Sequence, residues 1–243
     1  MRIGTDRLLE VLAAHDATAT FFVLGWIAEK YPDLIAKVAA AGHEIACHTY
    51  CHHLINQSDP AGFRADLLKA KRLLEDASGQ AVIGFRAPYF SIDESSEWAF
   101  EILAEEGFRY DSSIFPARRL IGGCPSGRTE AYTIQTPAGD LLEIPVTVVD
   151  FLGRRFTMFG GGYFRLLPLG LVSSGIRNLN ARGISVNFYI HPHDLDPDQP
   201  RVKMGAFSRF RRYIGVSRTR QKLDRLLSRH KFRSIRDGWV GSV

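Results

Sequence analysis

The sequence has few cysteines and lacks any long apolar run. Three cysteines in 243 residues, Cys47, Cys51 and Cys124, are too few for a disulfide scaffold and indicate a reducing compartment. No apolar stretch approaches the ~18–20 residues that a membrane-spanning helix needs. Charges scattered through the first twelve residues break the basic-then-apolar order of a secretory signal. These absences predict a protein that is cytoplasmic or peripheral to the inner membrane.

Nucleotide-binding fingerprints are absent as well. There is no glycine-rich dinucleotide motif, and Gly160-Gly161-Gly162 is not followed by the Lys-Ser/Thr of a phosphate-binding loop, so we expect an ordinary loop there. With 45% hydrophobic and 23% charged residues, the chain can bury one sizeable core. No repeat or Ser/Thr-rich linker divides it, so the sequence predicts a single domain over residues 1–243.

The net charge of +5 hides an uneven distribution. Between Arg201 and Arg236 there are thirteen Lys or Arg and one acidic residue, Asp224, whereas the rest of the chain has 18 basic and 25 acidic residues. The basic region, residues 201–243 of the same domain, could contact an anionic lipid surface or glycan, or could be a solvated helix face. Because no RNA-binding or DNA-reading motif accompanies it, we expect no nucleic-acid partner.

Short β-rich runs alternate with helical patterns along the chain. Helices are expected between the runs; one of them begins at Asp59-Pro60 and ends at Gly79. Such repeated strand–helix units predict an α/β fold with parallel strands covered by helices. Strands are expected at 19–24, 43–47, 82–85, 108–110, 185–190 and 232–235, with a hairpin over 132–136 and 141–149.

Polar side chains follow several of these predicted strands. They are His48 with His52, Arg86, Asp111 and His191, each at or just after a strand end. The carboxyl ends of parallel strands in a barrel open on one face, where barrel enzymes carry out their chemistry. We therefore expect these residues to form one catalytic face.

His48 and His52 are candidate metal ligands. Two histidines four residues apart on a helical turn face the same way and could chelate zinc, cobalt or nickel, although surface residues often have this spacing too. Cys47 and Cys51 flank them and are either further zinc ligands or small buried residues. Because structural zinc sites usually contain paired C-x-x-C spacing, we favour the buried interpretation.

The other strand-end residues suit acid, base and anion chemistry. Arg86 can orient a carboxylate through two parallel hydrogen bonds, and the amide of Tyr89 could help hold an oxyanion. His191 has the pKa range of a general acid, and Asp111 could support Arg86 or a histidine. The alternatives are a surface arginine, a half-buried histidine and a capping aspartate.

The order of these motifs resembles the NodB-homology polysaccharide deacetylases, carbohydrate esterase family 4. The resemblance covers nearly the whole chain and implies a distorted (β/α)7-type barrel that hydrolyses N-acetyl groups on a glycan with the help of a divalent metal, zinc before cobalt or nickel. The matching segments are Ala17-Thr18-Ala19-Thr20-Phe21-Phe22-Val23-Leu24-Gly25, Gly42-His43-Glu44-Ile45, His48-Thr49-Tyr50-Cys51-His52, Arg86-Ala87-Pro88-Tyr89 and Ile190-His191.

The same resemblance implies a role for each site residue. His48 and His52 hold the metal, and the Tyr89 amide helps stabilise the oxyanion. His191 protonates the leaving amine. Arg86 orients a base aspartate, and Asp111 supports that network.

Three further segments, 109–116, 160–165 and 191–197, resemble deacetylases encoded beside exosortase and exopolysaccharide genes. That resemblance implies an N-acetylated exopolysaccharide or its lipid-linked precursor as substrate. It also fits the lack of a signal peptide.

The opening strand of the family, which ends in two acidic residues, has no counterpart in this sequence. In the family one aspartate is the general base and its neighbour is the third metal ligand. Residues 1–6 align with the helix after that motif, and we expect neither Asp6 nor Asp16 at a strand end. We therefore expect a barrel without its first strand and an open metal site.

Three explanations stay open: a truncated sequence, which we favour, a carboxylate supplied from elsewhere, and a catalytically inactive homologue that binds glycans. In the last case aromatic side chains would stack on sugars, although aromatic residues at such positions more often belong to the core. The candidates are Phe90, Trp98, Tyr163 and Phe164.

Overall fold

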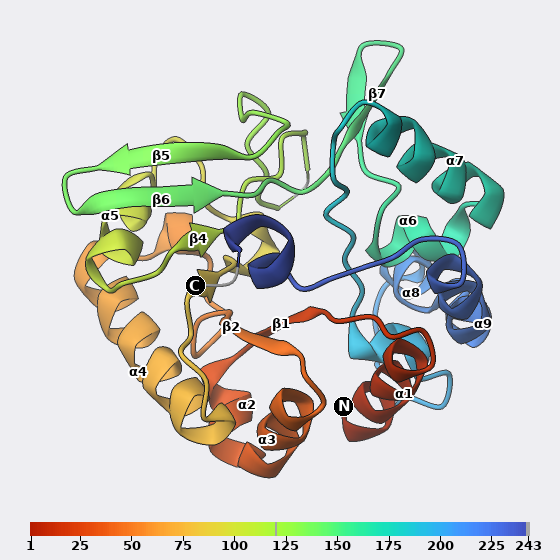
Figure 1. The fold of residues 1–243 in the computed structure, drawn as a ribbon, viewed down its shortest axis with the longest axis horizontal. Coiled ribbons are helices and arrows are strands. Elements are labelled where there is room, and N and C mark those ends of the chain that lie inside the picture. The colour runs from red at the N-terminus through yellow and green to blue at the C-terminus, as the bar shows by residue number, and fades with distance from the viewer. Residues whose placement is uncertain (120, 242–243) are drawn as a thin grey trace. The chain divides into compact units, whose positions relative to one another are not determined.

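The computed structural model describes residues 1–119 and 121–241 (Figure 1). They form two compact units, each built from segments that are far apart in the sequence. The first unit comprises residues 1–17 and 156–232, and the second comprises residues 18–155 and 233–243.

The second unit contains a six-stranded sheet in the order β1-β2-β3-β4-β6-β5. Neighbouring strands are parallel except β5 and β6, which form an antiparallel hairpin where one was predicted, although its second strand runs over 139–143 and not over 141–149. The predicted α/β class, with parallel strands, is thereby confirmed. The strands are β1 (Thr20–Val23), β2 (Glu44–Cys47), β3 (Gly84–Phe85), β4 (Tyr110–Asp111), β5 (Tyr132–Thr136) and β6 (Gly139–Glu143), and a separate small sheet pairs β7 (Val149–Phe151) with β8 (Arg154–Phe156).

The register of this sheet brings five strand ends level with one another. Val23 pairs with Cys47, Cys47 with Phe85, Phe85 with Asp111, and Asp111 with Glu143. Each of these residues is the last of its strand. The loops that follow β1, β2, β3, β4 and β6 therefore all start from one edge of the sheet.

Four α-helices connect the strands of this unit. The longest, α4, begins where the sequence predicts: the Asp59 carboxylate accepts the Gly62 N–H at 2.9 Å and Pro60 occupies the first turn. It ends at Gly79, which adopts a left-handed conformation with φ 66°. The helices are α2 (Gly25–Lys30), α3 (Pro32–Ala40), α4 (Pro60–Ser78) and α5 (Trp98–Glu105) (Figure 1).

The predicted strand at 232–235 is wrong. The backbone N–H groups of Ser234 and Ile235 donate to the side-chain oxygens of Thr18 and Thr20, at 3.0 and 2.7 Å, instead of to a neighbouring strand. A single π-helical turn, Arg236–Val240, follows. Ile235 itself joins the buried core beside β4.

The first unit is mainly helical. Helix α1 (Arg2–Ala13) packs against α9 and against a 3₁₀ turn, η3 (Pro192–Leu195). None of the helices in the described residues is long and apolar enough to cross a membrane. The other helices are α6 (Gly161–Leu166), α7 (Leu169–Ala181), α8 (Ala206–Tyr213) and α9 (Val216–Leu227) (Figure 1).

Two predictions fail in this unit. Residues 185–190 do not form a strand; the backbone makes one isolated parallel bridge, between Tyr189 and Gly160. The triple glycine is not a loop, because Gly161 and Gly162 open α6. Gly160 lies close to the backbone of Tyr189. A Cβ at Gly160 would lie 2.3 Å from the Tyr189 carbonyl oxygen, so a side chain at this position would prevent the bridge.

Candidate functional site

His48 and His52 lie on the loop after β2. Their rings meet edge to face, with centroids 5.1 Å apart. The predicted helical turn is wrong, because Thr49 and His52 adopt left-handed conformations with φ 66° and 61°. The loop is nevertheless well held: the Asp66 carboxylate on α4 accepts the N–H groups of the two residues after Thr49, at 2.6 and 3.2 Å.

The hydrogen bond that His48 makes sets its tautomer. Its Nδ1 lies 2.6 Å from the Arg86 carbonyl oxygen, which can only accept, so Nδ1 carries the proton. The lone pair is then on Nε2, as in histidines that bind metal through Nε2 and donate from the other nitrogen. Burial lowers the pKa of His52, which favours the neutral, ligand-competent imidazole. These two residues therefore fit a divalent metal.

The cysteines do not extend this donor set. Cys47 is fully buried, and burial raises the pKa of its thiol to about 12, so it stays protonated and is not a thiolate ligand. Cys51 is exposed, and all three cysteines are free thiols. The buried interpretation thus holds for Cys47.

The Arg86-Ala87-Pro88-Tyr89 segment turns sharply after β3. Tyr89 and Phe90 both have left-handed backbones, with φ 55° and 58°. The half-exposed Tyr89 ring lies edge to face with His52, 5.0 Å between centroids. Arg86 is buried: its Nε donates to the Ser112 carbonyl at 3.0 Å, and its guanidinium stacks 4.2 Å from the Phe22 ring.

Asp111 connects to this turn through a serine. The carboxylate is fully buried and accepts the Ser113 hydroxyl at 2.6 Å and the Ser113 N–H at 3.0 Å. The same hydroxyl oxygen accepts the Ala87 N–H at 2.7 Å. Asp111 thus fixes the backbone between Arg86 and Tyr89 through Ser113. We call this chain of hydrogen bonds the Ser113 relay.

Glu143 belongs to the same cluster and was missed at the sequence level. It ends β6 opposite Asp111, is fully buried, and accepts the Ile114 N–H at 3.1 Å. Burial raises the pKa of Glu143 well above its usual range, and the neighbouring Asp111 charge raises it further. Burial raises the pKa of Asp111 too. The predicted strand runs over 141–149, so Glu143 does not stand at a predicted strand end and no local signal in the sequence marks it.

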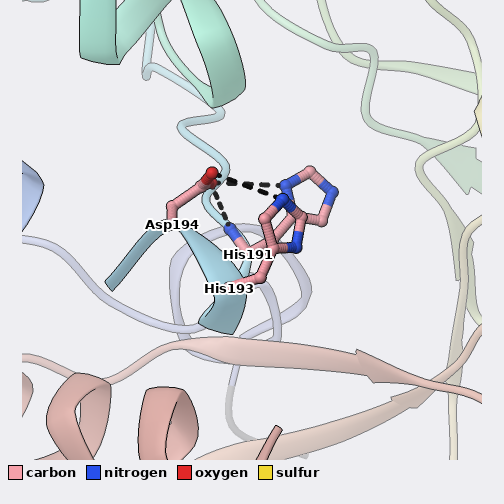
Figure 2. A group of neighbouring side chains, drawn as sticks. All are labelled: His191, His193 and Asp194. Atoms are coloured by element: carbon pink, nitrogen blue, oxygen red, sulfur yellow. Dashed lines mark hydrogen bonds and ion pairs between the residues drawn. The ribbon is translucent and has the colours of Figure 1, made fainter. Parts of the chain in front are cut away.

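His191 lies in the first unit, beside His193 and Asp194 (Figure 2). The His191 N–H donates to Asp194 Oδ2 at 3.0 Å, and its Nδ1 is 3.5 Å from the same oxygen. The two imidazoles stack with centroids 5.0 Å apart. His48 and His52 belong to the other unit.

Asp194 lies buried in the 3₁₀ turn η3 and forms an ion pair. Arg165, itself buried, donates to Asp194 Oδ1 and also to the carbonyl oxygens of Arg211 and Ile214, at 2.6 and 2.9 Å. Potential ligand atoms of His191, His193 and Asp194 lie within 4.8 Å of one another, close enough for a metal site. The carboxylate is already paired with a guanidinium, however, so this group is better suited to orienting His191.

The pKa of His193 points the same way. Burial, followed by the positive charges of Arg212 and Arg165, lowers the pKa of His193 to about 4. A metal cation bound beside His193 would be repelled by the same two arginines.

The aromatic candidates for sugar stacking divide into two groups. Phe90 and Phe164 are buried in the core, whereas Tyr163 is half-exposed. Trp98 is partly buried and packs edge to face on Phe63. Of the four, only Tyr163 offers an open face.

Comparison with known proteins identifies two family matches. Residues 2–110 match the family model described as polysaccharide deacetylase, and residues 112–240 match a domain of unknown function, DUF3473. A peptidoglycan-N-acetylglucosamine deacetylase of Bacillus cereus is 36% identical over 98 residues, which are 40% of this chain and 36% of that protein. A chitooligosaccharide deacetylase of Bradyrhizobium is 37% identical over 101 residues, 41% of this chain and 43% of that protein.

The chain thus spans well under two thirds of the length of these curated relatives. A solved structure from Mycobacterium smegmatis, assigned to the polysaccharide deacetylases, matches with a TM-score of 0.66 at 23% identity and covers 95% of this chain and 73% of that one. This likeness confirms the predicted fold class. The chain therefore belongs to the DUF3473 family, and its residues 2–110 form a polysaccharide deacetylase segment that precedes the DUF3473 domain.

Proposed function

We propose that this protein removes N-acetyl groups from an N-acetylated glycan by metal-dependent amide hydrolysis. The observation that carries the proposal is the hydrogen bond from His48 Nδ1 to the Arg86 carbonyl oxygen. It joins two of the motifs that resemble the deacetylases, and it orients the imidazole of His48 as metal-binding imidazoles are oriented. The deacetylase names of the curated relatives support the same activity.

His48 and His52 would hold the metal, zinc before cobalt or nickel. When bound, such an ion polarises an acetamide carbonyl and lowers the pKa of a coordinated water. We assign neither the general base nor a third metal ligand to a residue of this chain.

The other residues act through hydrogen bonds and proton transfer. In our proposal the Tyr89 amide stabilises the oxyanion, in a turn that Asp111 holds through Ser113. Arg86 would orient the base from its buried position. His191 would protonate the leaving amine, and Asp194, close to Nδ1, would keep Nε2 as the nitrogen that exchanges the proton.

The substrate class follows from the resemblance alone. The segments at 109–116, 160–165 and 191–197 support an exopolysaccharide or its lipid-linked precursor. We propose this glycan as the natural substrate.

The test is metal-dependent release of acetate from an N-acetylated oligosaccharide by the full-length protein. His191→Ala should lower the rate by about 10²–10⁴-fold, the usual contribution of a general acid. His52→Ala should lower the rate by weakening metal binding. His53→Ala, an exposed neighbour on the same loop, is the matched control and should change little. A protein that binds the oligosaccharide but releases no acetate with zinc, cobalt or nickel would be a glycan-binding module, and the proposed activity would be wrong.

A further inference from the structure

Helix α8 exposes large apolar side chains on an otherwise basic surface. None of its eight residues is buried. Phe207 is 67% exposed and Phe210 53%, and Val202 in the preceding loop is 53% exposed. Such a concentration of exposed apolar groups marks a contact surface, because burying each phenylalanine would be favourable.

The sequence of α8 separates apolar from basic residues around its axis. At 3.6 residues per turn, Ala206, Phe207, Phe210 and Tyr213 fall within an arc of about 120°. The remaining arc is filled by Ser208, Arg209, Arg211 and Arg212. This is the pattern of helices that lie in the plane of a membrane interface.

The segment of sequence that contains α8 has basic residues and no acidic ones. Between Gln199 and Leu223 there are eight Lys or Arg and no acidic residue. Arginines are also part of a cavity of about 460 Å³ with largely apolar walls, where they could pair with phosphate oxygens. The cavity is lined by Arg201, Ala206, Arg209, Phe210, Tyr213 and Ile214.

The helix is firmly attached to its own unit. Arg165 donates to the carbonyl oxygens of Arg211 and Ile214 at its C-terminal end. The Tyr213 hydroxyl accepts the Val202 N–H at 3.1 Å and donates to the Pro200 carbonyl at 3.4 Å. The exposed phenylalanines therefore belong to an anchored helix and not to a frayed end.

We propose that α8 docks on a bilayer containing anionic phospholipids. Phe207 and Phe210 insert at the boundary between headgroups and acyl chains, and the arginines pair with lipid phosphates. A second copy of the chain is a poorer partner, because two positively charged surfaces would then face and repel each other. A nucleic-acid duplex would use the arginines but leave both phenylalanines in water. The inference does not depend on the deacetylase activity.

Vesicle binding by the full-length protein tests this directly. We expect binding to phosphatidylcholine vesicles that contain phosphatidylglycerol, weakening as salt increases, and none to phosphatidylcholine alone. Phe207→Ser combined with Phe210→Ser should weaken binding at least about tenfold. Leu171→Ser changes an exposed apolar residue on α7 of the same unit and is the matched control, which should bind like the wild type.

Several outcomes would overturn the proposal. They are an absence of binding to anionic vesicles, equal weakening of vesicle binding by the Phe207→Ser/Phe210→Ser double variant and by the control, or a concentration-dependent dimer that the double variant abolishes. Binding to duplex DNA that needs the arginines but not the phenylalanines would also refute it. If the Phe207→Ser/Phe210→Ser double variant misfolds, hydrogen exchange of the unaltered protein tests the proposal instead. The amides of residues 206–213 should be protected from exchange by anionic vesicles and not by neutral ones.

Discussion

Replacing Ser113 with alanine removes one hydroxyl from the Ser113 relay. That hydroxyl donates to Asp111 at 2.6 Å and accepts the Ala87 N–H at 2.7 Å, and both bonds are buried. The methyl side chain of alanine leaves the Ala87 N–H and one Asp111 oxygen without these partners, in a place that solvent does not reach. Each unsatisfied buried group costs about 1–3 kcal/mol, so we expect the free energy of unfolding to fall by about 2–6 kcal/mol.

The chain offers a control with the same chemistry in water. Ser95 donates its hydroxyl to Asp93 Oδ1 at 2.6 Å, the same length as the Ser113 bond, but it is exposed. Water can replace that bond, so Ser95→Ala should change stability by no more than about 0.5 kcal/mol. The comparison isolates burial from hydrogen-bond length.

Urea unfolding followed by tryptophan fluorescence is the assay. The three tryptophans, Trp26, Trp98 and Trp239, all lie in the unit that contains both serines. Ser113→Ala should lower the urea midpoint by roughly 1 M or more. Similar midpoints for the two variants would show that the relay does not stabilise the turn as we argue.

Three other predictions are tested by urea unfolding followed by far-ultraviolet circular dichroism, because Asp194, Arg165 and Gly170 lie in the unit whose sequence contains no tryptophan. Asp194→Asn leaves the buried guanidinium of Arg165 without its carboxylate and should lower the free energy of unfolding by about 3–5 kcal/mol. Arg165→Met combined with Asp194→Leu removes both charges and should recover most of that loss. An equal loss of stability in the double variant would contradict this. Glu143→Gln should stabilise the protein relative to wild type by an amount that grows as pH rises from about 4.5 towards neutral. Burial raises the pKa of this carboxyl in the folded protein, so above about pH 4.5 the unfolded wild type releases the proton that the folded protein keeps, and wild-type stability falls. A gain independent of pH would refute the assignment. Gly84→Ala would place a Cβ 2.0 Å from the tyrosine ring on β4 and should destabilise the protein by about 1–3 kcal/mol or more. Gly170→Ala on α7, whose Cβ would have nothing within 4 Å, should stabilise the protein by about 0.5–1 kcal/mol. Changes in the free energy of unfolding with the same sign for both variants would contradict this reasoning.

Elements with local end signals could be predicted from the sequence. Helix α4 follows from Asp59-Pro60 at one end and Gly79 at the other, because capping depends on neighbouring residues only. The run at 185–190 misled, because a strand also needs a partner along its length, and this segment finds a single bridge at Tyr189. Residues 232–235 misled for a related reason, since threonine hydroxyls take the N–H groups that a neighbouring strand would have bound.

The candidate site divides in the same way. His48, His52 and Arg86 could be selected because each follows a strand and carries useful chemistry. Glu143 and Arg165 could not, because their importance depends on sheet register and on partners 29 or more positions away in the chain. Left-handed backbones such as that of His52 also escaped notice, since they occur at residues other than glycine.

The hydrogen bonds at the sheet edge also bear on how this protein could change during evolution. His48 is tied to the Arg86 carbonyl, Ala87 to Ser113, and Ile114 to Glu143, so consecutive strand ends are fastened to one another. The bonds are made in the first few residues after each strand, and the longer loop between β4 and β5 lies beyond them. Insertions or deletions in that loop would therefore leave these hydrogen bonds, and the position of His48, intact. The loop can thus diverge in length and sequence while the hydrogen-bonded strand ends stay unchanged.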